Sequence, residues 1–356
     1  MRHLIRLRRL ALWVVAVAVT GWLCPHTAIA QTTVSVGSHP ACPDCRIEVT
    51  EIARLDGDPA TAPCISPGEA GVATDELGRY YVRSCRGNEV AVFDAGGRFL
   101  RLLGGRGEGP GEFPSTILKL VVVDDTLNVL TRSRVTRYGT DLQLLDVRSR
   151  TGGGALKDVL FLDDEYVVEV RDYPSPASAG QPFFVLRGGV LQSNFGDTTG
   201  VYYLDAPVLA WRSLAMADRS HFWAAHRGRY DVELWSIDGE LERTISRDLS
   251  WFPPLERPMR EAPDIANVPQ LTDLKTDASA QLWAIVNPGR HQWLEQGGQL
   301  VEVLGEDGTL IASQVVPLSL RGWLGERLAY GLFGGNEGGP PFVVVYEVAL
   351  TGTSSH

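Results

Sequence analysis

The stretch that decides the fold is GVATDELGRYYVRSCRGNEVAVFDAGGRFLRLLGGRGEGPGEF, residues 71–113. It holds four short apolar or aromatic runs, which are separated by turns rich in Asp, Gly and Asn. Apolar runs that flank such turns are typical of β-hairpins. The stretch therefore predicts four antiparallel strands, followed by a glycine-rich joint at residues 104–113, GGRGEGPGEF.

The glycine-rich joint also suggests a phosphate cradle, which needs a following helix whose N-terminal amides bind the anion. Its glycine spacing is not that of the nucleotide-binding motifs, and no Lys-Ser or Lys-Thr pair ends it. Pro114 and a β-rich run, residues 118–123, follow instead. We therefore predict that the joint carries the chain from one sheet to the next, because glycine allows the backbone angles of the reversal.

The same pattern recurs along the chain, with units starting near residues 69, 115, 155, 210, 270 and 318. A period of about 40 to 55 residues with four strands per unit is typical of β-propellers. The last unit lacks an outer strand, whereas residues 46–55, RIEVTEIARL, form an alternating strand that belongs to no unit. We predict an all-β, six-bladed β-propeller of four-stranded antiparallel blades, with the ring closed by this N-terminal strand. Irregular third and fifth units leave seven blades as the alternative.

The N-terminus has the features of a secretory signal peptide. Arginines within residues 2–9 precede an apolar run, residues 10–19, and Ala28-Ile29-Ala30 offers a small-x-small cleavage site. We expect cleavage near Ala30 and export to the periplasm or beyond the cell, with no membrane span in the mature chain. The predicted organisation is a signal peptide (1–30), a cysteine-containing segment with the closing strand (31–68) and the β-propeller (69–356).

Four cysteines follow the predicted cleavage site: Cys42, Cys45, Cys64 and Cys85. An even number of cysteines in an exported chain predicts disulfides, of which three pairings are possible for four cysteines. We expect the disulfides to tie the N-terminal segment to the first sheet. A zinc site is the alternative, because Cys42 and Cys45 have the spacing of half such a site, but Cys64 and Cys85 do not form a second close pair.

Residues 71–113 resemble an NHL-type repeat and, more narrowly, the exported bacterial six-bladed propellers with a GxGPGEF joint between blades. This resemblance implies the fold. It implies little about function, because propellers host lyases, lactonases, hydrolases and binding scaffolds alike.

Two sets of recurring side chains are interpreted as structural. Carboxylates recur after the inner strands, where we expect them to cap turns, because a catalytic residue is normally unique to one blade. Aromatic residues recur in the second strands, where we expect them to pack between blades. The carboxylates are Asp75, Asp124, Asp163, Asp218 and Asp277. The aromatic residues are Tyr80, Tyr81, Phe222, Trp223 and Trp283.

Basic residues gather on one predicted face, although the formal net charge of −10 argues against general nucleic-acid binding. This face carries the loops between second and third strands, the joints between blades and the starts of the inner strands. Arginine suits carboxylates and phosphates, and a focused positive field attracts anions. The alternative is that these arginines are ordinary surface residues paired with carboxylates such as Glu108, Asp172 and Asp231. The candidate ligand-binding residues are Arg83, Arg86, Arg106, Lys119, Arg132, Arg134, Lys157, Arg171, His226, Arg227, Arg229, Arg290, His291 and Arg321.

The sequence favours an exported, monomeric binding module without a cofactor, which recognises an anionic ligand, a peptide or a glycan at the arginine-rich face. Its partner would be an exported protein, a peptide or a glycan. The alternative is a hydrolase or lyase that depends on calcium or zinc in the central channel, although no catalytic residue can be assigned and no G-x-S-x-G motif occurs. A structural component of the cell envelope is the third hypothesis.

Overall fold

The computed structural model describes residues 32–56, 63–150, 155–172, 181–196, 211–254, 268–289, 298–334 and 341–352. The chain divides into two compact units, Met1–Ala30 and Gln31–His356. The first unit, which is the predicted signal peptide, lies outside the described residues, and so do the candidates Arg290 and His291. The described part holds no helix with the length and apolar character that crossing a membrane requires.

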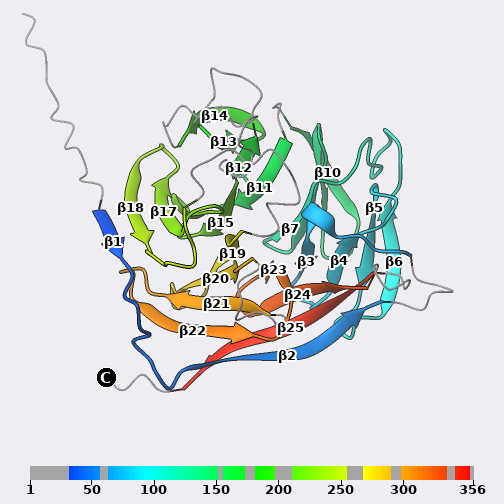
Figure 1. Ribbon diagram of the computed structural model, residues 1–356. Helices are drawn as coiled ribbons and strands as arrows, with labels where there is room; N and C mark the ends of the chain where they lie inside the picture. The colour runs from blue at the N-terminus through cyan, green and yellow to red at the C-terminus, as the bar shows by residue number, and fades with distance from the viewer. Residues whose placement is uncertain are drawn as a thin grey trace, which may run out of the picture. The chain divides into compact units, whose positions relative to one another are not determined.

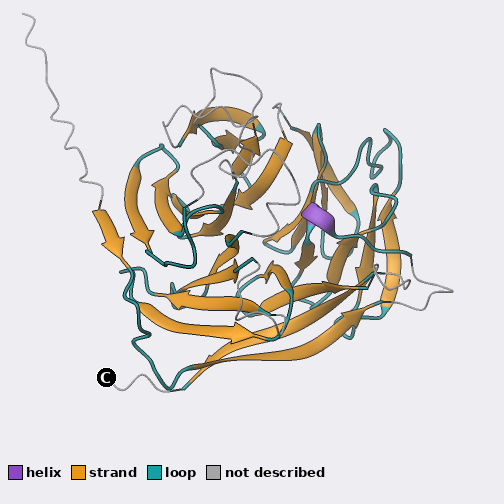
Figure 2. Cartoon of the chain, viewed as in Figure 1, coloured by secondary structure: helices purple, strands orange, loops and turns teal. Residues whose placement is uncertain are grey.

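Within Gln31–His356, six antiparallel sheets are arranged as the blades of a propeller (Figure 1). The inner strands contact one another in chain order, and the inner strand of the last blade contacts that of the first. Strands make up nearly all the regular structure that Figure 2 shows, beside one short 3-10 turn, η1 (Gly68–Ala70). The predicted six-bladed propeller is therefore confirmed, and the seven-bladed alternative is wrong.

The first three blades follow the predicted units. Blade 1 consists of β3 (Val72–Thr74), β4 (Tyr80–Arg83), β5 (Glu89–Phe93) and β6 (Phe99–Gly104). Blade 2 consists of β7 (Lys119–Val123), β8 (Thr126–Leu130), β9 (Arg134–Tyr138) and β10 (Leu144–Ser149). Blade 3 consists of β11 (Ala155–Phe161), β12 (Tyr166–Asp172), β13 (Phe183–Arg187) and β14 (Val190–Phe195).

The last three blades include strands from the N-terminal segment. Blade 4 consists of β15 (Arg212–Met216), β16 (His221–His226), β17 (Asp231–Ser236) and β18 (Leu241–Ser246), to which β1 (Thr32–Ser35) is added. Blade 5 consists of β19 (Gln270–Thr276), β20 (Leu282–Asn287), β21 (Gln299–Leu304) and β22 (Leu310–Val316). Blade 6 consists of β23 (Leu320–Leu324), β24 (Leu328–Phe333), β25 (Phe342–Thr351) and β2 (Arg46–Leu55).

The ring is closed by β2, which is the outer strand of blade 6. It pairs antiparallel with β25 in a register that runs from Arg46 opposite Thr351 to Leu55 opposite Val343. A strand of the N-terminal segment and the C-terminal strand β25 therefore share one sheet (Figure 1). This confirms the predicted role of residues 46–55.

The N-terminal segment also covers the outer edges of two further blades, which the sequence did not predict. β1 pairs parallel with β18 of blade 4, and the Ala41 amide donates to the Leu310 carbonyl of blade 5 at 2.7 Å. Val34 lies so close to the turn before β22 that a Cβ on Gly308 would be 2.6 Å from the Val34 Cγ1. Covering a sheet edge removes hydrogen-bonding groups that would otherwise pair with another chain.

Both predicted disulfides are present, as Cys42–Cys45 and Cys64–Cys85. The second disulfide joins the N-terminal segment to the turn after β4, as expected for a tie to the first sheet. The expectation is wrong for Cys42–Cys45, which links residues three apart within the segment itself. Its cysteines pack beside side chains of blades 5 and 6, such as Trp283 and Val348.

The hydrophobic core is divided into clusters that lie between adjacent blades. The five recurring aromatic residues of the second strands are at most 4% exposed, and each belongs to such a cluster. Their predicted packing role is confirmed. The cluster between blades 2 and 3 is small, and the buried Arg150–Glu169 ion pair lies in the same interface, with donor–acceptor distances of 2.6 and 2.7 Å.

Four of the five recurring carboxylates cap turns, as predicted, whereas this role stays a prediction for Asp124. The Asp75 carboxylate accepts hydrogen bonds from the Arg79 amide at 2.9 Å and the Tyr81 hydroxyl at 2.7 Å. The equivalent Asp277 accepts from the Gln281 amide at 3.0 Å and from the indole of Trp283 at 2.7 Å. Each carboxylate thus ties its own turn to the buried aromatic residue of the following strand.

The glycine-rich joint links β6 of blade 1 to β7 of blade 2. Phe113 at its end is fully buried, and its amide donates to the Gly105 carbonyl at 2.7 Å. Gly104 has a φ of 81°, and a Cβ there would be 2.1 Å from the Phe113 ring. The glycines therefore allow the chain to fold over the ring of Phe113, which anchors the joint in the core.

Replacing this anchor should destabilise the propeller. We expect Phe113→Ala to lower the free energy of unfolding by about 3–5 kcal/mol, because it removes a fully buried ring. Leu100→Ala, at a side chain that is 44% exposed in the preceding strand, should cost less than about 1 kcal/mol. Urea denaturation of both variants measures the difference, and similar losses would contradict the anchoring role.

The two disulfides should differ in their effect on stability. Cys64–Cys85 closes a loop with a sequence separation of 21, whereas Cys42–Cys45 closes one of only 3. On a loop-entropy basis, replacing both cysteines of the longer loop by serine should cost about 3 kcal/mol, and the shorter loop roughly half as much. Chemical denaturation of the two double variants compares them, and the reverse order would contradict the expectation.

Candidate functional site

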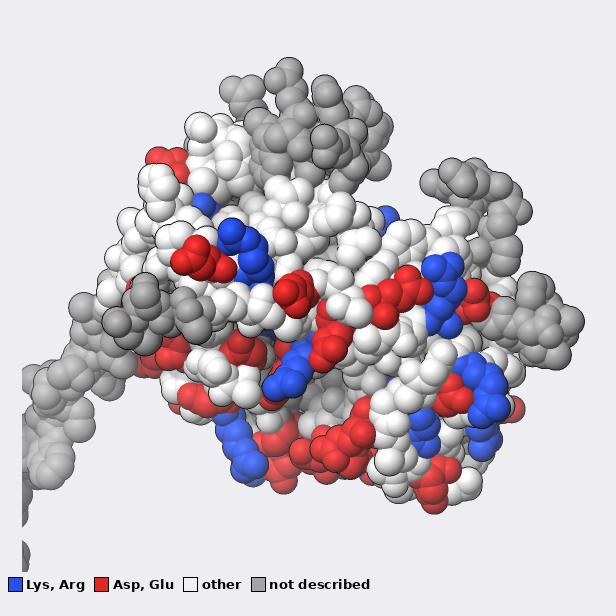
Figure 3. Space-filling model, turned by 90° about the horizontal axis from the view of Figure 1, so that it is seen from below, with Lys and Arg blue, Asp and Glu red and all other residues white. Residues whose placement is uncertain are grey.

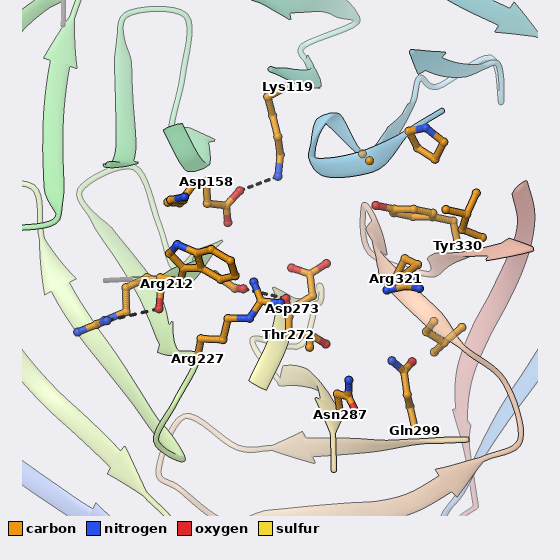
Figure 4. A pocket seen from close by; sticks show the side chains of 18 residues that line it. Lys119, Asp158, Arg212, Arg227, Thr272, Asp273, Asn287, Gln299, Arg321 and Tyr330 are labelled. Carbon is orange, nitrogen blue, oxygen red and sulfur yellow. Dashed lines mark hydrogen bonds and ion pairs between the residues drawn. The ribbon is translucent and has the colours of Figure 1, made fainter. Parts of the chain in front are cut away.

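A cavity of about 500 Å³ lies at the centre of the ring, at the end where the inner strands begin. All six blades contribute to its lining, and Figure 4 shows their side chains converging on it. This volume is in the range of small-molecule binding sites. One lining residue from each blade, in blade order, is Gly71, Lys119, Asp158, Arg227, Asp273 and Arg321.

Irregular strand pairing turns three residues toward the cavity. In the inner strands β11, β19 and β23, the pairing with the second strand of the blade skips one residue after the first one or two paired residues. The skipped residues are Lys157, Thr272 and Arg321, and all three line the cavity. The side chain of the extra residue in a β-bulge points in a different direction from that in a regular strand. Bulges at equivalent places in three inner strands therefore supply much of the polar lining.

Two carboxylates of the lining tie neighbouring blades together. Asp158 of blade 3 forms an ion pair with Lys119 of blade 2 at 2.7 Å, and it accepts the Leu214 amide of blade 4 at 2.9 Å. Asp273 of blade 5 accepts the Trp323 amide of blade 6 at 2.7 Å. These bonds fix the positions of the inner strands, and therefore the shape of the cavity.

The carboxylate of Asp273 has a strongly shifted pKa. Burial raises this pKa to about 7, with a further contribution from the charge of Asp158, while Lys119 and two backbone amides act in the opposite direction. The pKa of Lys119 is raised by its ion pair with Asp158, which outweighs the effect of burial. At neutral pH Lys119 is thus charged, whereas Asp273 is partly protonated.

The lining carries an excess of positive charge. Among the described residues, five basic and two acidic residues line the cavity, and one of the basic residues, Arg212, has its guanidinium 3.9 Å from Glu233. The excess of three contrasts with the formal net charge of −10 for the whole chain. On the surface seen in Figure 3, by comparison, Lys and Arg lie interspersed with Asp and Glu. The five basic residues are Lys119, Lys157, Arg212, Arg227 and Arg321.

The ring of Trp211 contacts two of these cationic side chains. The Arg227 guanidinium lies 4.3 Å from the centroid of the Trp211 ring, and the Lys157 ammonium lies 4.8 Å from it. The Arg227 Nε also donates to the Gln270 side chain at 2.6 Å. These contacts hold two cations, one from blade 3 and one from blade 4, on the same indole.

The Trp211 Nε1 and the Gln299 Oε1, both of the lining, are buried without a hydrogen-bond partner among the described residues. Gln299 is 9% exposed, and its side chain rises into the cavity in Figure 4. Buried polar groups in proteins are nearly always paired with protein or with water. These two atoms therefore mark places where a bound molecule can hydrogen-bond.

The structure brings four of the predicted candidates together. Lys119, Lys157, Arg227 and Arg321 line the cavity, and three of them were chosen because they lie near the starts of inner strands. Arg321 makes no hydrogen bond or ion pair with another described residue through its side chain, and it is exposed.

The other described candidates do not line this cavity. Most of them have structural contacts: Arg83 donates to the Ser66 and Ile117 carbonyls, Arg171 pairs with the buried Glu169, and Arg134 pairs with Glu108. A role in ligand binding stays a prediction for all of them. These candidates are Arg83, Arg86, Arg106, Arg132, Arg134, Arg171, His226 and Arg229.

Three of these candidates make contacts that their positions in the repeat do not reveal. Arg86 pairs with Glu89 at 3.2 Å, and Arg229 pairs with Asp231 at 3.3 Å. His226 is buried, and its pKa lies well below the usual value because of burial and of the nearby Arg212 and Arg229 charges. His226 is therefore neutral and acts as an acceptor, through its Nδ1, for the Gly228 amide.

Sequence reasoning missed Arg212, Asp158, Asp273 and Gln299 in the lining. Arg212 is the first residue of β15, so the rule that singled out Lys119 could have found it. Asp158 and Asp273 follow the skipped residues of β11 and β19, a match visible in the sequence as Leu-Lys-Asp and Leu-Thr-Asp. Gln299 carries no comparable signal.

Among the described residues, no three His, Cys, Asp or Glu side chains gather into a group that could hold a metal ion. The metal-dependent alternative stays a prediction from the sequence.

Comparison with known proteins shows the class of fold. No protein-family model and no curated protein matches the chain. Among solved structures, it is similar to a putative exported protein from Bacteroides fragilis (10% identity, TM-score 0.58, 90% of this chain and 100% of that chain). It is also similar to a member of the DUF4221 family from Bacteroides vulgatus (11% identity, TM-score 0.55, 86% and 99%). The chain is thus a six-bladed β-propeller, and these likenesses extend to the fold alone.

The raised pKa of Asp273 should make stability depend on pH. Because the folded-state pKa of about 7 exceeds the unfolded value near 3.8, the folded protein holds the proton more tightly between these pH values. The free energy of unfolding of the wild type should therefore fall, relative to Asp273→Asn, as pH rises from about 4 to about 7, by about 1.4 kcal/mol for each unit of pKa shift. Urea denaturation at pH 5 and pH 8 tests this, and parallel pH profiles would contradict it.

Proposed function

We propose that the chain is an exported binding module that holds a small anionic ligand in its central cavity. Export is supported by the signal-peptide pattern of residues 1–30 and by the two disulfides. The observation that carries the binding function is the excess of cationic side chains in a cavity that belongs to an acidic protein.

The size of the cavity limits the ligand. About 500 Å³ admits a small molecule, such as an acidic sugar, or the end of a peptide or glycan chain, rather than a folded surface. Arginine and lysine bind carboxylates and phosphates through charge-assisted hydrogen bonds. The rigid inner strands present these groups in a fixed arrangement, which lowers the cost of ordering them on binding.

The catalytic alternative has one supporting observation. Asp158 and Asp273 line the same cavity, and the pKa of Asp273 is shifted to about 7 while Asp158 is paired with Lys119. A carboxyl group whose pKa lies near neutral pH is suited to general acid–base catalysis. Here, however, both carboxylates also accept backbone amides of neighbouring blades, and that structural role accounts for their equivalent positions in blades 3 and 5.

A matched pair of arginines tests the binding function. Arg227 lines the cavity, whereas Arg229, two residues further, pairs with Asp231 outside the lining. We expect Arg227→Gln to weaken binding of galacturonate, an acidic monosaccharide, about tenfold, because it removes one charged contact. Arg229→Gln should leave the affinity within about twofold.

Isothermal titration calorimetry at low ionic strength measures both affinities. Equal effects of the two substitutions, or no binding of galacturonate, phosphate or acetate to the wild type, would contradict the proposal.

A further inference from the structure

Lys119 is paired with Asp158, and the buried Arg212 guanidinium lies 3.9 Å from Glu233. The other three cationic side chains of the described lining lie in two groups on opposite sides. The first, which we call the Trp211 group, consists of Lys157 of blade 3 and Arg227, which follows β16 of blade 4. The second is Arg321 of blade 6. Because the inner strands contact one another in chain order around a ring of six, β11 and β23 lie three blades apart and face each other across the centre. Figure 4 shows Arg227 and Arg321 on opposite sides of the cavity.

The part of the cavity wall that lies between the two cationic groups presents side-chain amides. Asn287 and Gln299 of blade 5 line it, and both rise into the cavity below Asp273 and Arg321 in Figure 4. Gln299 is more than nine-tenths buried, and its Oε1 has no hydrogen-bond partner among the described residues. A buried amide acceptor that faces a cavity needs a donor, which a hydroxyl group of a ligand supplies.

We propose that the ligand carries two anionic groups, one held by the Trp211 group and the other by Arg321, on a hydroxyl-bearing frame that hydrogen-bonds to Gln299. An acidic disaccharide with a carboxylate on each sugar has this chemistry. The proposal rests on the binding function above, and it adds the number and the placement of the charges.

The two groups are suited to a ligand that bridges them. The Trp211 group is held by the indole and by Gln270, so its position does not depend on a ligand. Arg321 is exposed, and the planar fork of its guanidinium can take a carboxylate through two parallel hydrogen bonds. When one anionic group is bound, the second meets its partner at a high effective concentration.

The test compares galacturonate, which has one carboxylate, with digalacturonate, which has two, by calorimetry at pH 6. We expect digalacturonate to bind the wild type at least about tenfold more tightly, since it gains a second charged contact. Arg321→Gln should abolish this difference while changing the affinity for galacturonate by at most about twofold, because the Trp211 group, with two cations, remains to bind a single carboxylate. Arg98→Gln, at an exposed arginine paired with Asp94 outside the lining, is the matched control and should change neither affinity.

A further experiment tests the hydroxyl-bearing frame of the ligand. Adipate carries two carboxylates without hydroxyl groups, so Gln299→Leu should weaken digalacturonate about tenfold and leave adipate nearly unchanged. Thermal unfolding of each variant shows that the fold is retained.

The outcomes separate the two proposals. If galacturonate binds but digalacturonate binds no more tightly, or if Arg321→Gln weakens both ligands equally, the two-group inference is wrong while anion binding stands. If Gln299→Leu weakens adipate as much as digalacturonate, or weakens neither, the assigned role of the frame is wrong. If neither sugar binds the wild type, the proposed function itself fails for this class of ligand.

Discussion

The antiparallel pairing of β2 with β25 is the contact on which the rest of the structure depends. It makes the outer strand of blade 6 from the N-terminal segment and so closes the ring across the two ends of the chain. The chain passes from β2 of blade 6 to β3 of blade 1, so the two ends of the chain meet within blade 6, between β2 and β25. The hydrogen bonds of this pairing join the last blade to the first, and a hydrophobic cluster lies between blades 6 and 1.

Closure also shapes the centre of the ring. The inner strands are held at fixed positions by bonds between neighbouring blades, such as those of Asp158 and Asp273. The same carboxylates lie among the cations of the cavity. Their charge is reduced where it would oppose an anion, because Asp158 is paired with Lys119 and the pKa of Asp273 is raised. The same small cavity can therefore contain carboxylates that bind neighbouring blades and still keep an excess of positive charge.

Much of the fold could be predicted from the sequence, because the signals are local. Hairpin turns, the alternation of residues 46–55 and the glycine-rich joint of residues 104–113 all act over a few residues, and the structure agrees with each of them. The β1 strand could not be predicted. Four residues, Thr32–Ser35, carry too little pattern, and their partner β18 lies more than two hundred residues away. The role of Cys42–Cys45 was also missed, since spacing does not show which surfaces a short loop packs against.

The candidate site, like the fold, could be predicted from the sequence only in part. The sequence by itself determined the blades, their order and the basic residues at the starts of inner strands, because repeats place equivalent residues at equivalent positions. Only the tertiary structure decided which of those residues meet. It turned Lys157 and Arg321 inward through bulges, placed them on opposite sides of the cavity, and directed Arg134 and Arg229 to nearby carboxylates instead. The physical reason is that a strand's register and the angle between blades set where a side chain points, and both depend on contacts between residues far apart in the chain.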